Sequence, residues 1–555
     1  MRAPTSMPID RRRLLIGGGA TAATLLARPW QALARGEEVA ATRAGKLRGT
    51  VVDGVHTFLG VPYAAPPVGE LRLASPRPVA AWQGERDATK PGAAPMQTLG
   101  GAGTWLYEGA DPQGEDCLTL NVWTPALTGN RPVMVWMYGG AWRIGHASVA
   151  AADGRNLAKT GDVVVVAMNY RLGALGWLGH PDLRDRETGA AANWGLQDQI
   201  AALNWVKDNI ANFGGDPGNV TIFGESAGGT TVVLIAQNER SAGLCHKVIA
   251  QSPALFTGPS FVDLKDAAGY AEAVAARLST KVAGLRSVPA AQLHMAEGQE
   301  ARARATPARI EPFYMAPVRD DLFVREWPRT NDGLVVPLLI GNNRDEGKFW
   351  FDLVQPSGQP VPGLKPPADD AALADQVGLL IKFMYPEPSK LAAVDVIGAY
   401  RAATGRRGGS TAIKDVFSEI YSDTLFRMQL SQLAARQTKR NRPAYVYEFA
   451  QPLKPPGRGT PHTAEVPYVF GNNAHPFFAA KLGDGPAENA IARATMEIWS
   501  SFARTGKPET ATTGPWPVYS AEKRAVGVIG GEKPFRIETA PRDAELRVWE
   551  ALYRV

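Results

Sequence analysis

The stretch Thr221 to Thr230 reads TIFGESAGGT, and its central serine stands between two glycines. The run before it, VTIFG (220–224), is typical of a strand, and the run after it, AGGTTVVLIAQ (227–237), is typical of a helix. An ordinary strand-to-helix turn could have this composition. The same context also defines a nucleophile elbow, in which small flanking residues allow a strained turn that exposes a serine hydroxyl above a sheet. We therefore predict that Ser226 is a nucleophile.

Apolar, often β-branched runs recur along the chain. They cover residues 133–140, 163–170, 220–224, 247–252, 335–343 and 445–449. Continuous apolar runs suit strands that are covered on both faces, as in a parallel sheet. The segment 193–214 instead has apolar residues three and four positions apart, which indicates an amphipathic helix. The sequence thus predicts an α/β fold with a large, mostly parallel sheet flanked by helices, and site residues beyond the carboxyl ends of its strands.

Composition excludes several functional classes. The chain has 555 residues, 45% of them hydrophobic, which is typical of a globular protein with a large core. Its formal charge is +6, and no Lys/Arg-rich run beyond the N-terminus suggests nucleic acid binding. Cys117 and Cys245 are the two cysteines, and the seven histidines show no metal-binding spacing. We expect no metal and no cofactor.

Residues 1–34 resemble a cleavable export signal. A basic stretch precedes a short Gly/Ala/Leu run and the small-residue triplet Ala32-Leu33-Ala34. The pair Arg11-Arg12 is typical of the twin-arginine type, which exports folded proteins across a bacterial inner membrane. An uncleaved anchor is the alternative, but the apolar run is short and glycine-rich for a membrane span. We predict a periplasmic or secreted protein without stable membrane insertion after the signal is removed.

Residues 35–555 are predicted to form one α/β domain. The proline-rich segments 355–367 and 452–461 are interpreted as surface loops, because strand-like segments continue on both sides of them. Residues 365–440 are mostly helical in pattern and could form a cap or side subdomain.

A serine hydroxyl becomes nucleophilic only when a base takes its proton and a third group orients that base. In folds with this elbow the acid and the histidine follow the serine along the chain. The run 335–343 leads into the acidic pair Asp345-Glu346, which could also be a solvated turn. The run 445–449 precedes His462 and His475. Chain order alone leaves both choices open.

Hydrolysis by a serine nucleophile also needs donors for the negative charge that develops on the carbonyl oxygen. The run 133–138 ends in Gly139-Gly140-Ala141. Backbone N–H groups of this turn, together with that of Ala227 after the serine, can form an oxyanion hole.

These motifs resemble the type B carboxylesterase family, the α/β-hydrolases that also include the cholinesterases. The matching segments are FLGVPYAAPPVGELRLASP (58–76), EDCLTLNVWTP (115–125), WMYGGAW (136–142), AMNYRLGALGWL (167–178), NWGLQDQIAALNWV (193–206), FGGDPGNVTIFGESAGG (213–229), IGNNRDEGKFW (340–350) and HTAEVPYVFG (462–471). They span nearly all of the chain after residue 34. The resemblance implies an α/β-hydrolase fold and a serine esterase acting on a small-molecule ester through an acyl-enzyme.

Carried over by position, the resemblance assigns the catalytic triad and the oxyanion hole. The triad is Ser226, Glu346 and His462. The oxyanion donors are the N–H groups of Gly140, Ala141 and Ala227. The third glycine of the family's loop is alanine here, which keeps the N–H and adds a methyl group beside the acyl carbon.

The resemblance also places other residues around the triad. Glu225 and Ser252 match positions behind it, where Glu225 either stabilises the imidazolium electrostatically or serves as a buried support. The family's QSG triplet is Gln251-Ser252-Pro253 here, so this sequence departs from the pattern next to Ser252. Glu465 is interpreted as a supporting acid and His475 as a loop residue.

In the family the cysteine of EDCL pairs with one in an upstream CPQ-like segment. That segment reads AAPMQ (93–97) in this chain, so Cys117 lacks the expected partner. We predict no disulfide, and we interpret Cys245 as a small buried apolar residue.

Two other functions compete with ester hydrolysis. A hydrolase of the same fold could be specialised for amides, lactones or carbamates, because the acyl-transfer residues are shared. A non-catalytic binding protein of this fold would have lost triad residues that are all present here. Five aromatic residues either line the substrate pocket or pack in the core: Trp105, Tyr107, Tyr138, Trp142 and Phe256. The sequence does not indicate the oligomeric state.

Overall fold

The structure is a computed structural model. It describes residues 36–100, 105–107, 109, 112–254, 262–305, 314–326, 333–354, 357–361, 363–384 and 391–550. The predicted export signal, residues 1–34, lies outside the described residues, as does Phe256.

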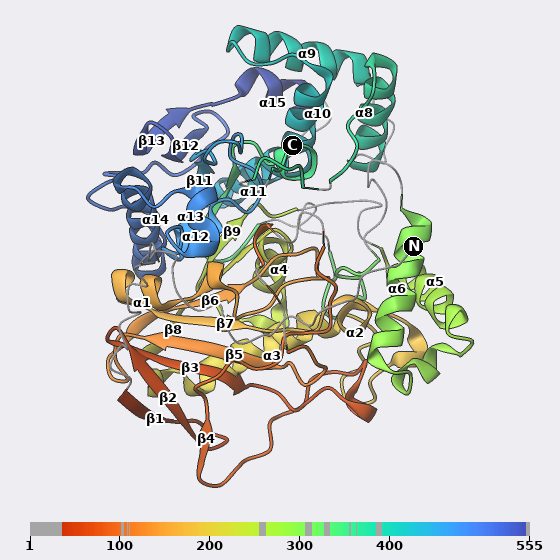
Figure 1. The fold of residues 1–555 in the computed structure, drawn as a ribbon, viewed down its shortest axis with the longest axis vertical. Coiled ribbons are helices and arrows are strands. Elements are labelled where there is room, and N and C mark those ends of the chain that lie inside the picture. Colours follow the sequence, from red (N-terminus) through yellow and green to blue (C-terminus); the bar gives the residue numbers. More distant parts are fainter. Residues whose placement is uncertain are drawn as a thin grey trace, which may run out of the picture.

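One large sheet, drawn in Figure 1, contains the thirteen strands of the described residues. They are β1 (Gly36–Ala41), β2 (Lys46–Val52), β3 (Val55–Pro62), β4 (Glu85–Asp87), β5 (Thr119–Thr124), β6 (Arg131–Met137), β7 (Val164–Met168), β8 (Gly215–Glu225), β9 (Lys247–Gln251), β10 (Leu338–Asn343), β11 (Ala444–Phe449), β12 (Ala525–Gly530) and β13 (Lys533–Thr539). Their order is β1-β2-β3-β5-β7-β6-β8-β9-β10-β11-β12-β13, and β4 pairs with β2.

The centre of this sheet is parallel. Strands β7, β6, β8, β9, β10, β11 and β12 pair in parallel. Towards the two edges the strands pair antiparallel, except that β4 pairs in parallel with β2. Every residue of β7, β9 after its first position, β10 and β11 is buried. This is the pattern expected for strands covered on both faces. The predicted large, mostly parallel sheet flanked by helices is therefore confirmed.

Each of the six predicted strand runs contains a strand, with different ends. The run 133–140 ends as strand β6 at Met137, because the following glycines form a turn. Strand β8 begins at Gly215, earlier than residue 220, since Gly215 pairs with Arg131. Strand β10 begins at Leu338 rather than at residue 335, where the side chain of Val335 is exposed.

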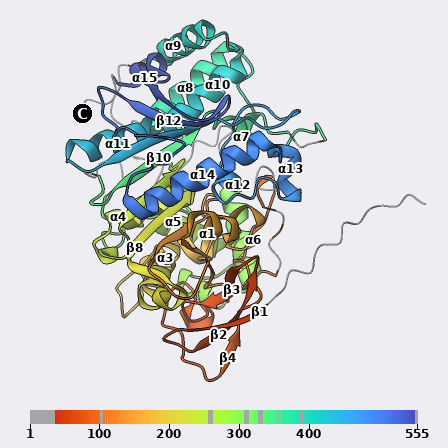
Figure 2. The same ribbon diagram turned by 90° about the vertical axis from the view of Figure 1, so that its left-hand side faces the viewer.

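Helices flank the sheet on both sides (Figures 1 and 2). The first group is α1 (Arg155–Gly161), α2 (Gly173–Trp177), α3 (Trp194–Asn209), α4 (Ala227–Gln237), α5 (Leu264–Arg277), α6 (Ala290–Arg304) and α7 (Lys348–Phe351). The C-terminal group includes α12 (Val466–Val469), α13 (Pro476–Leu482), α14 (Pro486–Thr505) and α15 (Asp543–Glu550). The helix predicted within 193–214 is α3, followed by a 3-10 turn over Ile210–Phe213.

From α7 to β11 the chain is mostly helical, and the first three of the four described helices of this segment lie at the top of Figure 1. The four helices are α8 (Asp370–Met384), α9 (Ala393–Arg406), α10 (Ile413–Ser422) and α11 (Met428–Lys439). A π-helical turn, Asp423–Arg427, joins α10 to α11 without a break. The C-terminal helix α15 packs on α9. No helix of the described residues is long and apolar enough to cross a membrane.

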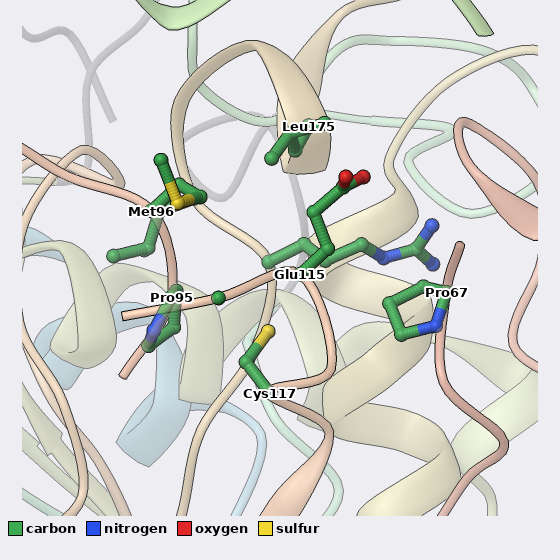
Figure 3. A pocket seen from close by; sticks show the side chains of 9 residues that line it. Pro67, Pro95, Met96, Glu115, Cys117 and Leu175 are labelled. Atoms are coloured by element: carbon green, nitrogen blue, oxygen red, sulfur yellow. The ribbon is translucent and has the colours of Figure 1, made fainter. Parts of the chain in front are cut away.

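Cys117 lies next to the segment that carries a cysteine in the family. Pro95 and Met96 line the same small cavity of about 10 Å³ as Cys117 (Figure 3). Both Cys117 and Cys245 are buried free thiols in the structure. Burial raises the pKa of both thiols, and a buried neutral thiol is unreactive. Apolar packing therefore occupies the place of a cross-link at this site.

Thiol titration tests the absence of a disulfide. We expect two free thiols per chain when the purified protein is unfolded in denaturant without a reducing agent. The same titration of native protein should react slowly, because both thiols are buried. Finding no free thiol in the unfolded, unreduced chain would contradict the prediction.

Candidate active site

Ser226 occupies a strained turn between β8 and α4. Its backbone angles are φ 56° and ψ −119°, a sparsely populated region that costs about 1–3 kcal/mol for a residue with a side chain. A Cβ atom at Gly228 would collide with the carbonyl oxygen of Met137, so this turn needs glycine for close approach. Ser226 is partly exposed, whereas its neighbours on both sides are buried. These are the features of a nucleophile elbow.

Glu346 and His462 meet beside this turn. Glu346 lies in the turn after β10, and His462 lies in the loop after β11. His462 Nδ1 is 2.5 Å from Glu346 Oε2, and both side chains are buried. Because β10 and β11 are parallel neighbours, their carboxyl ends bring these two loops to the same edge of the sheet.

The geometry distinguishes between the residues that chain order left open. Asp345 accepts a hydrogen bond from the N–H of Thr460 at 2.9 Å and forms an ion pair with Lys348 rather than with the imidazole. The N–H of Asp345 in turn donates to the Thr460 carbonyl at 3.0 Å, which links the acidic turn to the histidine loop. His475 instead begins helix α13, where its Nδ1 accepts a hydrogen bond from the N–H of Phe477 at 3.3 Å.

Two donors fix the other oxygen of Glu346. The hydroxyl of Ser252 donates to Glu346 Oε1 at 2.6 Å, and the N–H of Asn343 donates to the same atom at 2.7 Å. Ser252 has a positive φ of 43°, and its own N–H donates to the Gly341 carbonyl at 2.7 Å. With Oε1 occupied in this way, Oε2 is directed to the imidazole. Ser252 therefore contacts Glu346 even though proline, and not the glycine of the family's QSG triplet, follows it at position 253.

Glu225 lies on the opposite side of the imidazole. Its Oε1 is 3.1 Å from His462 Nε2, an ion-pair distance, and it has no hydrogen-bond partner among the described residues. No hydrogen bond joins the Ser226 hydroxyl to the imidazole in the described part of the chain. Catalytic hydrogen bonds are often long in an enzyme without substrate and become shorter in the reacting complex. In this resting arrangement His462 lies between two carboxylates.

These carboxylates change the acidity of the site. Burial disfavours the imidazolium, but the charges of Glu225 and Glu346 outweigh it and raise the pKa of His462 to about 9. Burial also raises the pKa of Glu225 well above its usual value, although the charge of His462 opposes this shift. His462 and Glu225 therefore compete for a proton.

Glu465 binds two residues that lie next to the acid and its partners. It is buried, and it accepts hydrogen bonds from Gln251 Nε2 at 3.1 Å and Asn343 Nδ2 at 2.5 Å. Gln251 is itself fixed by the indole N–H of Trp499, which donates to it at 3.0 Å. Burial, with a contribution from the charge of Glu346, raises the pKa of Glu465. The hydrogen bonds agree with a supporting role for this acid.

The predicted oxyanion loop packs directly on the elbow. A Cβ atom at Gly139 would lie 2.6 Å from Glu225 Oε2 and 2.9 Å from Ser226 Cβ, so only glycine fits there. Gly140 and Ala141 have positive φ angles of 100° and 53°. Among the described residues, none of the N–H groups of Gly140, Ala141 and Ala227 has an acceptor. These three donors are therefore available to a substrate oxygen.

The aromatic residues proposed for the pocket have different positions. Tyr138 stacks on Tyr170, and Trp142 packs on Trp177 and donates to Thr231, so both belong to the core. Tyr107 is also buried, and its hydroxyl lies 3.5 Å from the carbonyl oxygen of Gly139. Trp105 is buried beside the Lys481 ammonium.

Three other aromatic rings surround His462 and were not identified from the sequence. Trp350 stacks on the imidazole with centroids 5.2 Å apart, Phe426 lies at 4.9 Å, and Phe349 lies edge-on at 5.5 Å. Phe349 and Trp350 follow Glu346 closely in α7, so their proximity could have been inferred. Phe426 comes from the π-helical turn, 80 positions after Glu346, and has no local sequence signal.

No group of His, Cys, Asp and Glu side chains suited to a metal ion occurs among the described residues. What the site does contain is a strained serine, a buried histidine–glutamate pair and three backbone donors without acceptors. Together these groups can activate a hydroxyl and stabilise an oxyanion.

Comparison with known proteins gives the family. The model of the "Carboxylesterase family" matches residues 36–549. The chain belongs to the carboxylesterase family. It is 34% identical over 509 residues to the acylcarnitine hydrolase of Mus musculus, with 87% of this chain and 86% of the relative covered. It is 32% identical over 512 residues to the para-nitrobenzyl esterase of Bacillus subtilis, with 89% and 95% covered.

Solved structures of carboxylesterases have the same fold. The carboxylesterase of Geobacillus stearothermophilus superposes with a TM-score of 0.76 at 31% identity, covering 92% of this chain and 99% of that one. A PNB esterase superposes with a TM-score of 0.77 at 29% identity, covering 93% and 100%. The carboxylesterase described here therefore has the predicted α/β-hydrolase fold, and it is an enzyme that hydrolyses carboxylic esters.

The pH dependence of kcat/KM tests the electrostatics of this site. His462 accepts a proton only in its neutral form, and its pKa is raised to about 9. We therefore expect kcat/KM to rise with pH and to level off only as His462 loses its proton. The rising part of this profile at low pH is its acid limb. Glu225→Gln removes a nearby carboxylate, so the acid limb should move to lower pH by about one unit.

Glu239→Gln is the matched control, because Glu239 is an exposed carboxylate paired with Arg325. Its acid limb should coincide with that of the unaltered enzyme, since exposed charges are screened. An acid limb that stays in place in Glu225→Gln would show that Glu225 does not govern the imidazole.

Proposed function

We propose that this carboxylesterase acts through a Ser226–His462–Glu346 triad and an acyl-enzyme intermediate. The observation that carries the proposal is the convergence of a strained serine turn with the buried pair of His462 and Glu346, whose facing atoms are 2.5 Å apart. The three groups come from loops after β8, β10 and β11. This arrangement supports ester hydrolysis by two successive acyl transfers.

In the first step the Ser226 hydroxyl attacks the ester carbonyl carbon as His462 Nε2 takes its proton. The tetrahedral oxyanion accepts hydrogen bonds from the N–H groups of Gly140, Ala141 and Ala227. His462 then gives the proton to the departing alcohol, and the acyl group stays on Ser226. Water repeats the attack with His462 again as base, which releases the carboxylic acid and restores the serine.

Glu346 orients the imidazole and stabilises its charged form without accepting the proton. The hydrogen bonds from Ser252 and Asn343 support this role, because they keep Glu346 Oε2 directed at His462 Nδ1. Glu225 stabilises the imidazolium from the other side. For the attack, the imidazole Nε2 must turn from Glu225 to the hydroxyl of the next residue in the chain, Ser226.

Turnover of a p-nitrophenyl ester by purified, folded variants tests the triad. Ser226→Ala and His462→Ala should each lower kcat by roughly a million-fold, since either change removes the activated nucleophile. Glu346→Gln should cost about ten-thousandfold through a misoriented imidazole. His475→Ala is the matched control and should retain kcat, because His475 caps helix α13. Near-normal activity of His462→Ala, or its loss in His475→Ala, would overturn the assignment.

Pre-steady-state release of p-nitrophenol tests the acyl-enzyme. A burst close to one equivalent of active enzyme is expected when deacylation is slower than acylation. A panel of esters that varies acyl and alcohol size separately, with matched amides and lactones, would then define the substrate class.

We also propose that residues 1–34 direct twin-arginine-type export and are removed, which gives a periplasmic or secreted enzyme. Arg11-Arg12 and the triplet Ala32-Leu33-Ala34 support this. The Arg11→Lys/Arg12→Lys double variant should stay inside the cell, whereas Arg2→Lys should be exported normally. N-terminal sequencing of the exported protein should give Arg35. Unchanged export of the double variant would contradict a twin-arginine route.

A further inference from the structure

The π-helical turn between α10 and α11, together with the last residue of α10, contacts the turn that carries Glu346 on both sides of this residue. Before Glu346, Arg427 Nη2 donates to the Arg344 carbonyl at 2.9 Å. After Glu346, the N–H of Gly347 donates to the Ser422 hydroxyl at 2.8 Å. Ser422 immediately precedes the π-helical turn, and Arg427 ends it. π-Helical turns are rare and are frequent at functional sites.

Close packing makes these contacts specific. A Cβ atom at Gly347 would collide with the Ser418 carbonyl, so the acid turn is pressed against the last turn of α10. The Ser422 hydroxyl also donates to the Ser418 carbonyl at 2.6 Å, which orients its lone pair toward Gly347. Phe426, in the same π-helical turn, packs on the His462 ring. One short element thus contacts both the acid and the base.

A buried network of charges fixes Arg427 in turn. Arg427 pairs with Asp423 and lies 3.3 Å from Glu448, a residue of the neighbouring strand β11. Asp423 accepts a hydrogen bond from the Tyr400 hydroxyl at 2.8 Å, and Trp549 of α15 donates to that hydroxyl at 2.9 Å. The side chains of Arg427, Asp423 and Glu448 are all buried. A buried, paired arginine of this kind has little freedom to move.

We propose that Ser422 and Arg427 are positioning residues, which hold the Arg344–Gly347 turn so that the Glu346 carboxylate meets His462. The proposal rests on the triad proposed above. Neither residue touches the reacting atoms. Ser252 and Asn343 fix the Glu346 side chain, whereas Ser422 and Arg427 fix the backbone that carries it. Small displacements at a catalytic group can cost on the order of a hundredfold in rate.

The Ser422→Ala variant tests this role directly. It leaves the buried Gly347 N–H without its acceptor and adds no bulk. We expect kcat on a p-nitrophenyl ester to fall by about tenfold to a hundredfold, with KM changed by less than about twofold, because the loss arises at the catalytic groups. Ser422→Thr keeps a hydroxyl at this position and should restore kcat to within about threefold.

The pH profile separates positioning from a general loss of stability. Glu346, Glu225 and Glu465 are the carboxylates that raise the pKa of His462. A displaced Glu346 stabilises the imidazolium less, so the acid limb of kcat/KM in Ser422→Ala should move to lower pH. Lower stability alone would decrease the melting temperature and leave the acid limb in place.

Ser500→Ala is the matched control. Ser500 is a buried helical serine that donates to the carbonyl four residues earlier, at Met496, as Ser422 does at Ser418. It lies in α14, where a Cβ at Gly161 would meet it, and it should keep both kcat and the acid limb. If Ser422→Ala behaves like Ser500→Ala, the proposal is wrong.

The Arg427→Lys variant tests the proposal independently. It can be measured even if the Ser422→Ala variant does not fold. Lysine keeps the charge but lacks the fork that reaches Arg344, Asp423 and Glu448 together. It should also lower kcat and move the acid limb to lower pH, and an unchanged profile would contradict the role of Arg427.

Glu346→Gln is measured in parallel. Full activity in that variant would refute the triad itself, whereas its loss beside an unaffected Ser422→Ala would refute only the positioning role.

Discussion

The contact between Glu346 and His462 depends on a buried carboxyl group being held in place beside an imidazole. Charged groups taken out of water are stable only when they are paired and hydrogen-bonded. The structure meets this requirement with the Ser252 hydroxyl and the Asn343 N–H on one oxygen and the imidazole on the other. The residues that supply these two donors lie at the ends of β9 and β10.

The parallel register of the central strands explains how residues far apart in the sequence meet at the site. In register, Gly341 of β10 lies beside Gln251 of β9 and Tyr447 of β11. The strands therefore end together, and the residues that follow them share one edge. Ser252 follows β9, and Glu346 follows β10, so residues 94 positions apart are brought within hydrogen-bond distance. The contact between Ser252 and Glu346 therefore depends on the strand register of the sheet.

Three residues of the site that carry side chains have strained backbone conformations. Ser226, Ala141 and Ser252 all have positive φ angles, which residues with side chains adopt at an energetic cost. Glycines at positions 139 and 228 make this possible, because any side chain there would collide with neighbouring atoms. The buried side chains of Glu346 and His462 are held by hydrogen bonds and ion pairs. Ser226 and the N–H groups proposed to bind the oxyanion thus lie next to a closely packed, hydrogen-bonded part of the structure.

The sequence by itself determined the fold class, and it predicted a nucleophilic serine in a strand-to-helix turn. Continuous apolar runs predicted the parallel strands, and the GESAG turn predicted the elbow, because both signals depend on local backbone and burial preferences. From the residues alone, however, Asp345 and Glu346, like His462 and His475, stayed equivalent, and only the family resemblance favoured one of each.

Only the tertiary structure decided which carboxylate faces the imidazole and what holds it there. The contacts of Phe426, Ser422 and Arg427 with the site come from a π-helical turn and the last residue of α10, about 80 residues after Glu346, and no local pattern marks them. The proximity of Glu225 to His462 Nε2 likewise depends on how three loops pack. Local preferences act over a few residues, whereas these contacts depend on strand register and helix packing across the whole sheet.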